Sequence, residues 1–341
     1  MIPSTMRALE LRAYDGRVHL VEKPVPQPGP GQVLVRMAAS PVNPSDLKFL
    51  VGEYGVRKAL PVVPGFEGSG TVVAAGSGLV ARLRMGRRVA CMAPETGDGA
   101  WAEYMAAPAK RCIPLLGSVT LEQGATMVVN PWTAWALLDT ARRRGHRAAV
   151  HTAAAGALGR MMLRLGRRLN FPVVHVVRRP AQVELLRGLG AADVLDATAD
   201  GFDARLKEAC ARLNATVAFD PVAGEMTGRV LAAMPPGSRA IVYGSLSGAP
   251  CTVPPAQLVY ERKAVEGFWL SDWVSRRGLL GLGKMALTAQ RLAASDFATE
   301  IRARVPLQRA AEAIEAYRQE MTAGKVLLIP GEEAGSPVPG S

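Results

Sequence analysis

The stretch of the chain best suited to chemistry is a run of small residues between an apolar strand and a helix. Ala148–Val150 predicts a buried strand, and the apolar spacing that resumes around Gly159 predicts a helix. Gly156 and Gly159 stand in the turn, where backbone N–H groups can approach a diphosphate at the positive end of the helix. Ala154 stands where the first glycine of this pattern is usual. The stretch therefore predicts the start of a dinucleotide-binding βαβ unit, with close packing of helix on sheet as the alternative reason for small residues.

Two arginines follow the second strand of that unit. Val173–Val177 predicts a strand, and Arg178 and Arg179 come directly after it. A chain that prefers NAD places Asp or Glu here, about twenty residues after the turn, to bind the ribose 2′-hydroxyl. Guanidinium groups cannot accept a hydrogen bond from a hydroxyl, but they bind a 2′-phosphate through charge-assisted hydrogen bonds. The pair favours NADPH as the cofactor; the alternative is that both are ordinary exposed arginines.

Strands and helices alternate regularly through the residues that follow. Strands are expected at 148–150, 173–177, 194–195, 216–220, 240–243 and 265–270, and helices at 181–189, 202–213 and 226–234. This alternation implies a doubly wound parallel sheet, an α/β fold.

Residues 1–120 follow a different pattern, which predicts an irregular, strand-rich domain. The prolines and glycines of 24–31 form a stiff, turn-rich loop, and Pro44–Asp46 predicts the start of a helix. Further strands are expected at 32–38, 64–76, 85–93 and 99–106, and a helical stretch that contains Asn130 at 121–141. The small, polar tail Gly331–Ser341 is expected to be disordered.

Length and composition set the outer bounds. A chain of 341 residues that is 49% apolar can bury a large core and suggests two domains. It contains no run of eighteen uncharged apolar residues, and Met1–Arg7 lacks the apolar middle of a signal peptide. Its 4 cysteines are scattered without paired spacing, which fits a reducing compartment. We therefore expect a cytoplasmic protein with no membrane span.

The formal net charge of +12 raises the question of nucleic-acid binding. The basic residues are spread along the whole chain and are mostly arginine, without a basic tract interleaved with aromatic residues. The densest cluster, Arg142–Arg147, falls where a helix should end, and cations are stabilising there. The charge favours a solvated basic surface suited to polyanionic substrates, and no nucleic-acid partner is expected.

The whole arrangement resembles the medium-chain dehydrogenase/reductase superfamily. The resemblance rests on the strand-rich first domain, the glycine-bounded strand Gly65–Gly76, the Rossmann pattern and the return segment Gly324–Leu327. It implies a GroES-like catalytic domain made of residues 1–120 and 300–341, an NADPH-binding Rossmann domain at 121–299, and a homodimer.

Zinc alcohol dehydrogenases of that superfamily carry a Cys ligand near the position of Asn43 and a Gly-His-Glu at Gly65–Glu67. This chain has Asn43 and Gly65-Phe66-Glu67 instead, and its cysteines do not form a four-cysteine lobe. Neither an amide nor a phenyl ring supplies the ligand that a catalytic zinc needs. The chain therefore resembles a zinc-independent branch, and no metal site is predicted.

Two segments narrow the resemblance further. Asn43–Asp46 followed by Gly52–Gly55, and later Gly267–Trp273, are similar to segments of mitochondrial-type 2-enoyl thioester reductases. The resemblance implies NADPH-dependent reduction of trans-2-enoyl-CoA or enoyl-ACP, with hydride added at Cβ and a proton at Cα. An NADPH:quinone or enone oxidoreductase is the alternative with the same hydride chemistry. A catalytically silent NADPH-binding protein is a third possibility, from another functional class.

The resemblance also assigns roles to residues. Tyr54 becomes the proton donor, a suitable choice because a tyrosine hydroxyl stays protonated at neutral pH; the alternative is a packing tyrosine. The implied cofactor contacts are Asn130, Ala155, Gly156, Ala157, Leu158, Gly159, Arg178, Arg179, Tyr243, Gly244, Ser245, Leu246, Phe268, Trp269, Leu270, Ser271 and Lys325. Trp269 and Trp273 suit a substrate cleft, with core packing or a dimer interface as the alternative, and the 4 histidines suggest ordinary strand or surface positions.

Overall fold

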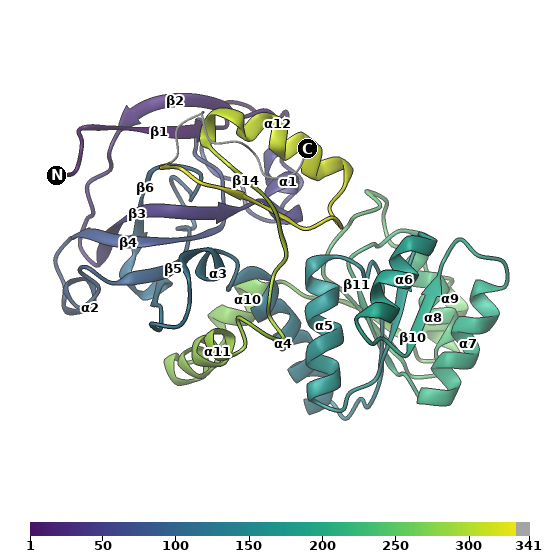
Figure 1. Cartoon of the computed structure of the whole chain (residues 1–341). Coiled ribbons are helices and arrows are strands. Elements are labelled where there is room, and N and C mark those ends of the chain that lie inside the picture. Colours follow the sequence, from purple (N-terminus) through teal and green to yellow (C-terminus); the bar gives the residue numbers. More distant parts are fainter. Residues whose placement is uncertain (332–341) are drawn as a thin grey trace. The chain divides into compact units, whose positions relative to one another are not determined.

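The chain folds into two compact units (Figure 1). The computed structural model describes residues 1–331, so the tail expected to be disordered lies, from residue 332 on, outside the described residues. Unit 1 contains Met1–Val129 and the described chain from Lys284 onward, and unit 2 contains Asn130–Gly283.

Unit 2 is built on a sheet of six strands. They are β8 (Ala149–His151), β9 (Val173–Val177), β10 (Asp193–Asp196), β11 (Val217–Asp220), β12 (Arg239–Val242) and β13 (Ala264–Gly267). Their order is β10-β9-β8-β11-β12-β13, and each neighbouring pair is parallel. The chain runs outward from β8 to β10 and then returns to the other side of β8 with β11. This order confirms the doubly wound α/β fold that the alternation predicted.

Helices cover both faces of this sheet. The helices of unit 2 are α4 (Val129–Arg143), α5 (Ala157–Arg168), α6 (Pro180–Gly188), α7 (Phe202–Leu213), α8 (Glu225–Ala233), α9 (Pro255–Val259) and α10 (Leu270–Ser275), and α11 (Leu279–Arg291) begins in this unit and continues into unit 1. Leu163 of α5 and Leu186 of α6 pack in one core cluster, whereas Phe202 of α7 and Leu231 of α8 pack in another. Figure 1 shows α5 on one side of the strands and α7 and α8 on the other. The apolar side chains of each helix thus fix its place against the sheet.

The predicted helical stretch at 121–141 is broken into two helices. A short helix, α3 (Leu121–Ala125), ends before α4 begins. The backbone N–H groups of Val128 and Val129 donate to the carboxylate of Glu67 at 3.1 and 2.9 Å. A carboxylate satisfies the unpaired N–H groups at a helix start, so α4 begins there instead of continuing α3.

Unit 1 is strand-rich, as predicted. Its strands are β1 (Thr5–Glu10), β2 (His19–Pro24), β3 (Gln32–Pro41), β4 (Glu67–Ala75), β5 (Arg88–Met92), β6 (Tyr104–Pro108), β7 (Cys112–Pro114), β14 (Ile301–Val305) and β15 (Lys325–Leu328). The main sheet has the order β14-β15-β3-β4-β5-β7, with β6 also paired to β3, and β1 and β2 form a separate pair. The strand predicted at 99–106 starts only at Tyr104, because the N–H groups of Gly99 and Ala100 bond to the carbonyl oxygens of Val63 and Gly65.

Few helices accompany these strands in the described part of unit 1. They are α1 (Pro44–Leu50), α2 (Leu79–Arg82), α3 and α12 (Ala310–Gln319), the part of α11 from Lys284 on, and the single turns η1 (Ala109–Arg111) and η2 (Leu307–Arg309). Pro44 stands in the first turn of α1, where the missing N–H costs nothing.

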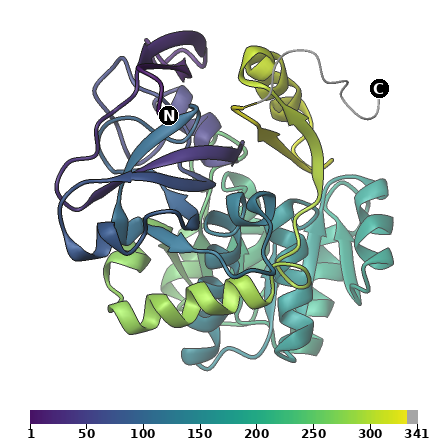
Figure 2. The ribbon, with the colours of Figure 1, turned by 60° about the vertical axis from the view of Figure 1, so that its left-hand side comes forward.

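The return segment completes the sheet of unit 1. Strands β14 and β15 with helix α12, yellow in Figure 2, add to the edge of β3, with β15 antiparallel to it. Ile314 and Tyr317 of α12 pack in the same core cluster as Leu47 and Phe49 of α1. The segment therefore brings the beginning of β15, including Lys325, next to the beginning of α1.

Two further observations concern the whole described chain. Cys91, Cys112, Cys210 and Cys251 are free thiols. Within residues 1–331, none of the helices has the length and apolar content needed to cross a membrane.

Candidate functional site

Tyr54 lies on the loop that follows α1 in unit 1. Its side chain is half-buried, and its ring packs against Phe66 with the centroids 4.9 Å apart and the planes tilted by 40°. Phe66 in turn packs edge-on against Phe49 at 5.4 Å. Aromatic pairs in such geometries contribute about 0.5–1.5 kcal/mol beyond the area that they bury. Phe66 therefore fixes the position of the Tyr54 ring.

The far end of the same loop is anchored by Lys58. Its ammonium donates to the carbonyl oxygens of Pro94 at 3.0 Å and Gly97 at 2.9 Å. The Tyr14 hydroxyl accepts from the Lys58 backbone N–H and donates to the Lys58 carbonyl oxygen, both at 2.8 Å. Burial lowers the pKa of Lys58 to about 8. The loop that carries Tyr54 is thus held at both ends.

A buried polar network lies at the beginning of α1. The side-chain amide of Asn43 donates from Nδ2 to Glu67 Oε1 at 3.0 Å. The ammonium of Lys325 donates to Asn43 Oδ1 and to the carbonyl oxygen of Val42, the latter at 3.1 Å. Asn43, Glu67 and Lys325 are at most 2% exposed. The amide of Asn43 therefore joins a carboxylate to an ammonium inside unit 1.

Asp46 connects this network with the residue that supports Tyr54. Its carboxylate is fully buried and accepts from the backbone N–H of Asn43 at 2.8 Å and from that of Phe66 at 3.1 Å. The first bond caps α1 from its third position. The second fixes the backbone of Phe66, whose ring packs against Tyr54.

Burial shifts the pKa values of these charged groups toward their neutral forms. It raises the pKa of Asp46 to about 7 and also raises that of Glu67. It lowers the pKa of Lys325 to about 8. The opposite charges oppose these shifts, because each ionised partner favours the ionised form of the other.

The glycine turn of unit 2 leads from β8 into α5. A Cβ at Gly159 would stand 2.0 Å from the carbonyl oxygen of Ala154, so only glycine fits there. At Gly156 an added Cβ would meet only the carbonyl oxygen of Ala153, at 3.6 Å. The backbone at Gly156 is therefore uncovered, and a ligand can approach the first turn of α5 there. Ala154 is fully buried, and its N–H donates to the Val176 carbonyl oxygen, so a small apolar residue suits that position.

Arginines surround this turn. Arg178 and Arg179 are both exposed at the carboxyl end of β9, and Arg179 precedes the first turn of α6. Arg160, only 5% exposed, donates from Nε to the Ala155 carbonyl oxygen at 2.9 Å. The sequence analysis did not single out Arg160. Its position directly after Gly159 was the available signal.

A buried histidine and a half-buried tyrosine meet across the sheet. The Nε2 atom of His151, the last residue of β8, shares a hydrogen bond of 2.7 Å with the hydroxyl of Tyr243, just after β12. Burial lowers the pKa of His151 to about 3 and that of its neighbour on β9, His175, to about 4. Both imidazoles are therefore neutral at neutral pH. The sequence suggested strand or surface positions for the histidines, and these two lie in strands β8 and β9. Nothing in the local sequence indicated the bond between His151 and Tyr243.

Asp220, the last residue of β11, organises the adjacent point of the sheet. Its buried carboxylate accepts from the hydroxyls of Thr152 at 2.5 Å and Thr227 at 2.6 Å. It also accepts from the backbone N–H groups of Val222 at 2.9 Å and Ala223 at 3.3 Å. These bonds fix the strand ends at which the sheet order reverses, where ligands of such folds bind.

Most of the predicted cofactor contacts of unit 2 lie at the carboxyl ends of its strands. They follow β8 (Ala155, Gly156, Ala157, Leu158, Gly159), β9 (Arg178, Arg179), β12 (Tyr243, Gly244, Ser245, Leu246) and β13 (Phe268, Trp269, Leu270, Ser271). Asn130 stands in the first turn of α4, and Trp269 is 42% exposed directly before α10. Tyr54 and Lys325 belong to unit 1. Because parallel strands end at one edge, the four loops lie along the same side of the sheet.

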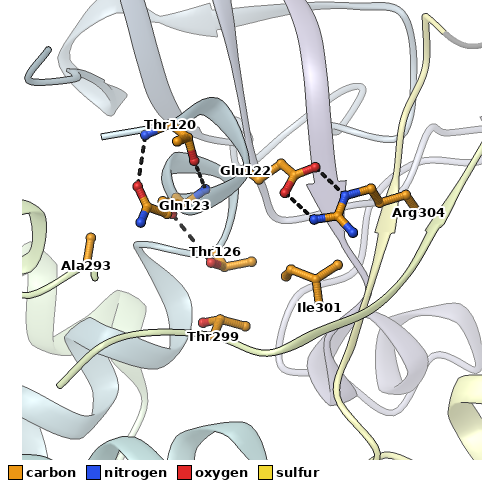
Figure 3. A pocket seen from close by; sticks show the side chains of 8 residues that line it. All are labelled: Thr120, Glu122, Gln123, Thr126, Ala293, Thr299, Ile301 and Arg304. Atoms are coloured by element: carbon orange, nitrogen blue, oxygen red, sulfur yellow. Dashed lines mark hydrogen bonds and ion pairs between the residues drawn. The ribbon is translucent and has the colours of Figure 1, made fainter. Parts of the chain in front are cut away.

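A separate cavity of about 340 Å³ lies within unit 1 (Figure 3). Glu122 and Arg304 lie next to each other in its lining and form a two-point ion pair at 2.5 and 2.7 Å. The rest of the lining is mostly threonine and glutamine and includes no predicted site residue. Because its two charged groups pair with each other, this cavity offers no unpaired charge to a substrate.

Metal binding depends on which donor groups a site contains. Across residues 1–331, no three His, Cys, Asp or Glu side chains gather as a metal site. Where the resemblance noted in the sequence would place zinc ligands, the structure has the amide of Asn43 and the ring of Phe66, and the neighbouring Glu67 bonds to Asn43. An amide engaged by an ammonium and a phenyl ring do not fit zinc.

Comparison with known proteins identifies the family. The "Alcohol dehydrogenase GroES-like domain" model matches residues 29–117, and the "Zinc-binding dehydrogenase" model matches residues 157–282. A crystal structure from Mesorhizobium loti, described as an NADPH:quinone reductase, is 35% identical and covers 97% of this chain and 100% of its own, with a TM-score of 0.89. This chain belongs to the medium-chain dehydrogenase/reductase superfamily. The resemblance noted in the sequence is thereby confirmed.

Two other members of the superfamily bear on the reaction. The mitochondrial enoyl-[acyl-carrier-protein] reductase of Mus musculus is 29% identical over 333 residues, which cover 95% of this chain and 84% of that protein. The quinone oxidoreductase of Thermus thermophilus, whose structures include a complex with NADPH, is 25% identical, with a TM-score of 0.76 and coverage of 95% and 100%. The chain is therefore related to oxidoreductases of both kinds.

Proposed function

We propose that this protein is an NADPH-dependent reductase of carbon–carbon double bonds in α,β-unsaturated thioesters. The observation that carries the proposal is the packing of the Tyr54 ring against Phe66, which fixes the position of the Tyr54 hydroxyl. By the resemblance noted in the sequence, Phe66 stands where zinc dehydrogenases have a metal ligand. Similarity over 95% of this chain to a mitochondrial enoyl-[acyl-carrier-protein] reductase supports the same reaction class.

The residues of unit 2 fit NADPH. The open backbone at Gly156 and the first turn of α5 suit a diphosphate, since N–H groups and the helix dipole favour negative charge there. The exposed Arg178 and Arg179 suit a 2′-phosphate. The loops after β12 and β13 would contact the nicotinamide half. When bound, NADPH supplies the hydride that reduces Cβ.

In unit 1, Tyr54 would hold the proton that Cα receives. Reduction at Cβ leaves negative charge on the thioester oxygen, and a hydroxyl can donate to the enolate or hold the water that does. The Phe66 ring and the Lys58 anchor keep Tyr54 in place. Proper placement of a general acid matters because the proton must be within hydrogen-bond reach.

No zinc takes part in the proposed reaction. The amide of Asn43 and the ring of Phe66 replace two zinc-binding side chains, and the partner of Asn43 Oδ1 is the Lys325 ammonium. We expect elemental analysis of the purified protein to find no stoichiometric zinc. One equivalent of zinc that is lost together with activity would contradict this part of the proposal.

The substrate class can be tested by following NADPH oxidation with crotonyl-CoA and, in parallel, with a soluble quinone. The proposal expects turnover of crotonyl-CoA. Turnover of the quinone alone would favour an NADPH:quinone oxidoreductase instead, the function in the name of the Mesorhizobium loti relative. Tight NADPH binding without turnover of either compound would favour a catalytically silent NADPH-binding protein.

We also propose a homodimer that forms along the outer edge of unit 2. Strand β13 is the last strand of its sheet, so one row of its backbone groups faces away from β12. Large apolar side chains are exposed near it: Val259 at 65%, Tyr260 at 83% and Val265 at 38%. Sedimentation should give a dimer for the parent and a monomer for a Tyr260→Lys/Val265→Lys variant. A monomeric parent would contradict the proposal.

A further inference from the structure

Helix α2 of unit 1 turns its large apolar side chains outward. Ala81, its smallest residue, is fully buried and packs in the same core cluster as Ala109 of η1. Figure 1 shows α2 at the periphery of unit 1. A surface helix usually buries its large apolar residues, and a group of exposed ones marks an interaction surface. Four such residues, called the α2 patch below, are exposed here: Leu79 at 73%, Val80 at 37%, Leu83 at 60% and Met85 at 47%.

Basic side chains border the α2 patch. Arg82 lies on α2 and Arg87 on the turn that follows it, whereas Lys110 belongs to η1, which packs against α2. All three are exposed, and within residues 1–331 none of them forms an ion pair. Arg84 is half-buried and donates from Nε to the Cys112 carbonyl oxygen at 3.0 Å. Positive charge next to the patch is thus available to an anionic partner.

No acidic residue interrupts this basic border along the chain. The sequence has no Asp or Glu from residue 68 to residue 94, which includes α2, or from residue 104 to residue 121, which includes η1. Glu95, the first acidic residue after α2, pairs with Arg111. The surface therefore combines apolar groups with positive charge, which is the combination that binds an anionic lipid surface.

We propose that the α2 patch docks this protein on the surface of a bilayer that contains anionic lipids. The apolar side chains enter the boundary between headgroups and acyl chains, and the basic side chains contact the lipid phosphates. Arginine suits this border, because its stem lies along apolar surface while its guanidinium stays among the headgroups. The proposal does not depend on the reaction proposed above, and the patch contains none of the predicted site residues.

The size of the patch favours a lipid surface over a protein partner. A stable protein interface buries about 800 Å² on each partner and involves about 20–30 residues of each. Four apolar side chains on one helical turn and the next supply only a small part of that area. Shallow insertion into a bilayer needs fewer apolar groups, because the anionic surface also attracts each nearby Lys or Arg.

The test is flotation of the purified full chain with lipid vesicles at low ionic strength. Vesicles of phosphatidylcholine and phosphatidylglycerol in equal parts should bind the parent, and vesicles of phosphatidylcholine alone should not. Leu79→Ser/Leu83→Ser should weaken binding to the anionic vesicles by about tenfold or more, since two large apolar side chains no longer leave water. Leu20→Ser/Leu185→Ser is the matched control, because these leucines are exposed at 44% and 36% outside the patch. It should bind like the parent.

The basic border is tested separately. Arg82→Gln/Arg87→Gln should weaken binding to the anionic vesicles by about tenfold and make it less sensitive to salt. Arg143→Gln/Arg187→Gln removes the same charge from unit 2, where the two arginines pair with Asp139 and Glu184 at the surface. This control should stay close to parental binding. All the changed positions are exposed, so the variants should fold like the parent.

Four results would overturn the proposal. One is a parent that does not bind the anionic vesicles. Another is equal binding by the patch leucine variant and its control. The third is equal weakening by the two arginine variants, which would mean that the net charge of +12 attracts the protein to lipid without the patch. The fourth is a lower mass for Leu79→Ser/Leu83→Ser than for the parent in sedimentation without lipid, which would make a second copy of this chain the occupant. Failure of the enoyl reductase assay would leave all of these binding results standing.

Discussion

Both units bury polar side chains next to the residues assigned to chemistry, but they neutralise them in different ways. Unit 1 buries the carboxylates of Asp46 and Glu67 together with the ammonium of Lys325. Unit 2 buries His151 and His175 as neutral imidazoles, because burial lowers their pKa values to about 3 and 4. Similar burial therefore gives opposite changes of stability in acid. The sign depends on whether the buried group is an acid, whose pKa burial raises, or a base, whose pKa burial lowers.

The sign of each response follows from proton binding. In unit 2 the unfolded chain binds protons to both histidines below pH about 6.5 while the folded state does not, so acid favours unfolding. In unit 1, burial raises the pKa of Asp46 to about 7. The folded state therefore takes up that proton first, and the contribution of Asp46 to stability grows as the pH falls from 7 toward 4.

The largest expected effect is a difference in acid stability between the units. By pH 4.5 the two histidines together should remove about 5 kcal/mol from the stability of unit 2. In hydrogen-exchange measurements, peptides from β8 and β9 should then lose their protection at a higher pH than peptides from α1 and β4. His175→Leu should move the acid transition of unit 2 to lower pH. Loss of protection in the unit 1 peptides first would contradict the claim that acid destabilises unit 2 before unit 1.

The next effect concerns the buried carboxylate of unit 2. Asp220→Ala leaves two hydroxyls and two backbone N–H groups without their acceptor. Each unsatisfied buried group costs about 1–3 kcal/mol, so a loss of about 3 kcal/mol or more is expected in urea unfolding. Asp203→Ala is the control, because Asp203 pairs with Arg229 at the surface, where an ion pair contributes about 0–1 kcal/mol. Equal losses for both variants would contradict the role given to Asp220.

A smaller effect tests the arginines at the end of β9. Replacing Arg178 and Arg179 with alanine should weaken NADPH binding at least tenfold, since each hydrogen bond to a charged group contributes about 1.5–3 kcal/mol. NADH has no 2′-phosphate, so its Kd should stay nearly unchanged. Arg187→Ala, on the exposed side of α6, is the control. Equal weakening for both cofactors, or a parent that prefers NADH, would refute the assignment.

The sequence predicted more of unit 2 than of unit 1. The helix at 202–213 and the strand at 173–177 have the predicted bounds, because apolar periodicity sets them locally. The strands β1, β2, β14 and β15 were not predicted. In β1 and β2, apolar and polar residues alternate only weakly, and β14 and β15 form strands by pairing with partners elsewhere in the chain.

The candidate site shows the same division. Motif spacing led to Tyr54, the glycine turn and the two arginines. It could not reveal that Lys325 bonds to Asn43, 282 positions away, or that Tyr243 meets His151 across 92 positions. Such contacts depend on the packing of whole elements, and no local pattern encodes them. Glu67 also ends the helical run at 121–141 from outside that segment.

The most direct test of the proposed reaction is the turnover of crotonyl-CoA by Tyr54→Phe. This change removes only a hydroxyl and keeps the ring that packs against Phe66. General-acid groups contribute about 10²–10⁴-fold, so kcat should fall by that factor while the Kd for NADPH stays near the parental value. Tyr260→Phe, which keeps the ring at the proposed dimer edge and lies outside the proposed active site, should keep parental kcat. Turnover by Tyr54→Phe close to the parental rate would contradict the role of Tyr54 as the proton donor.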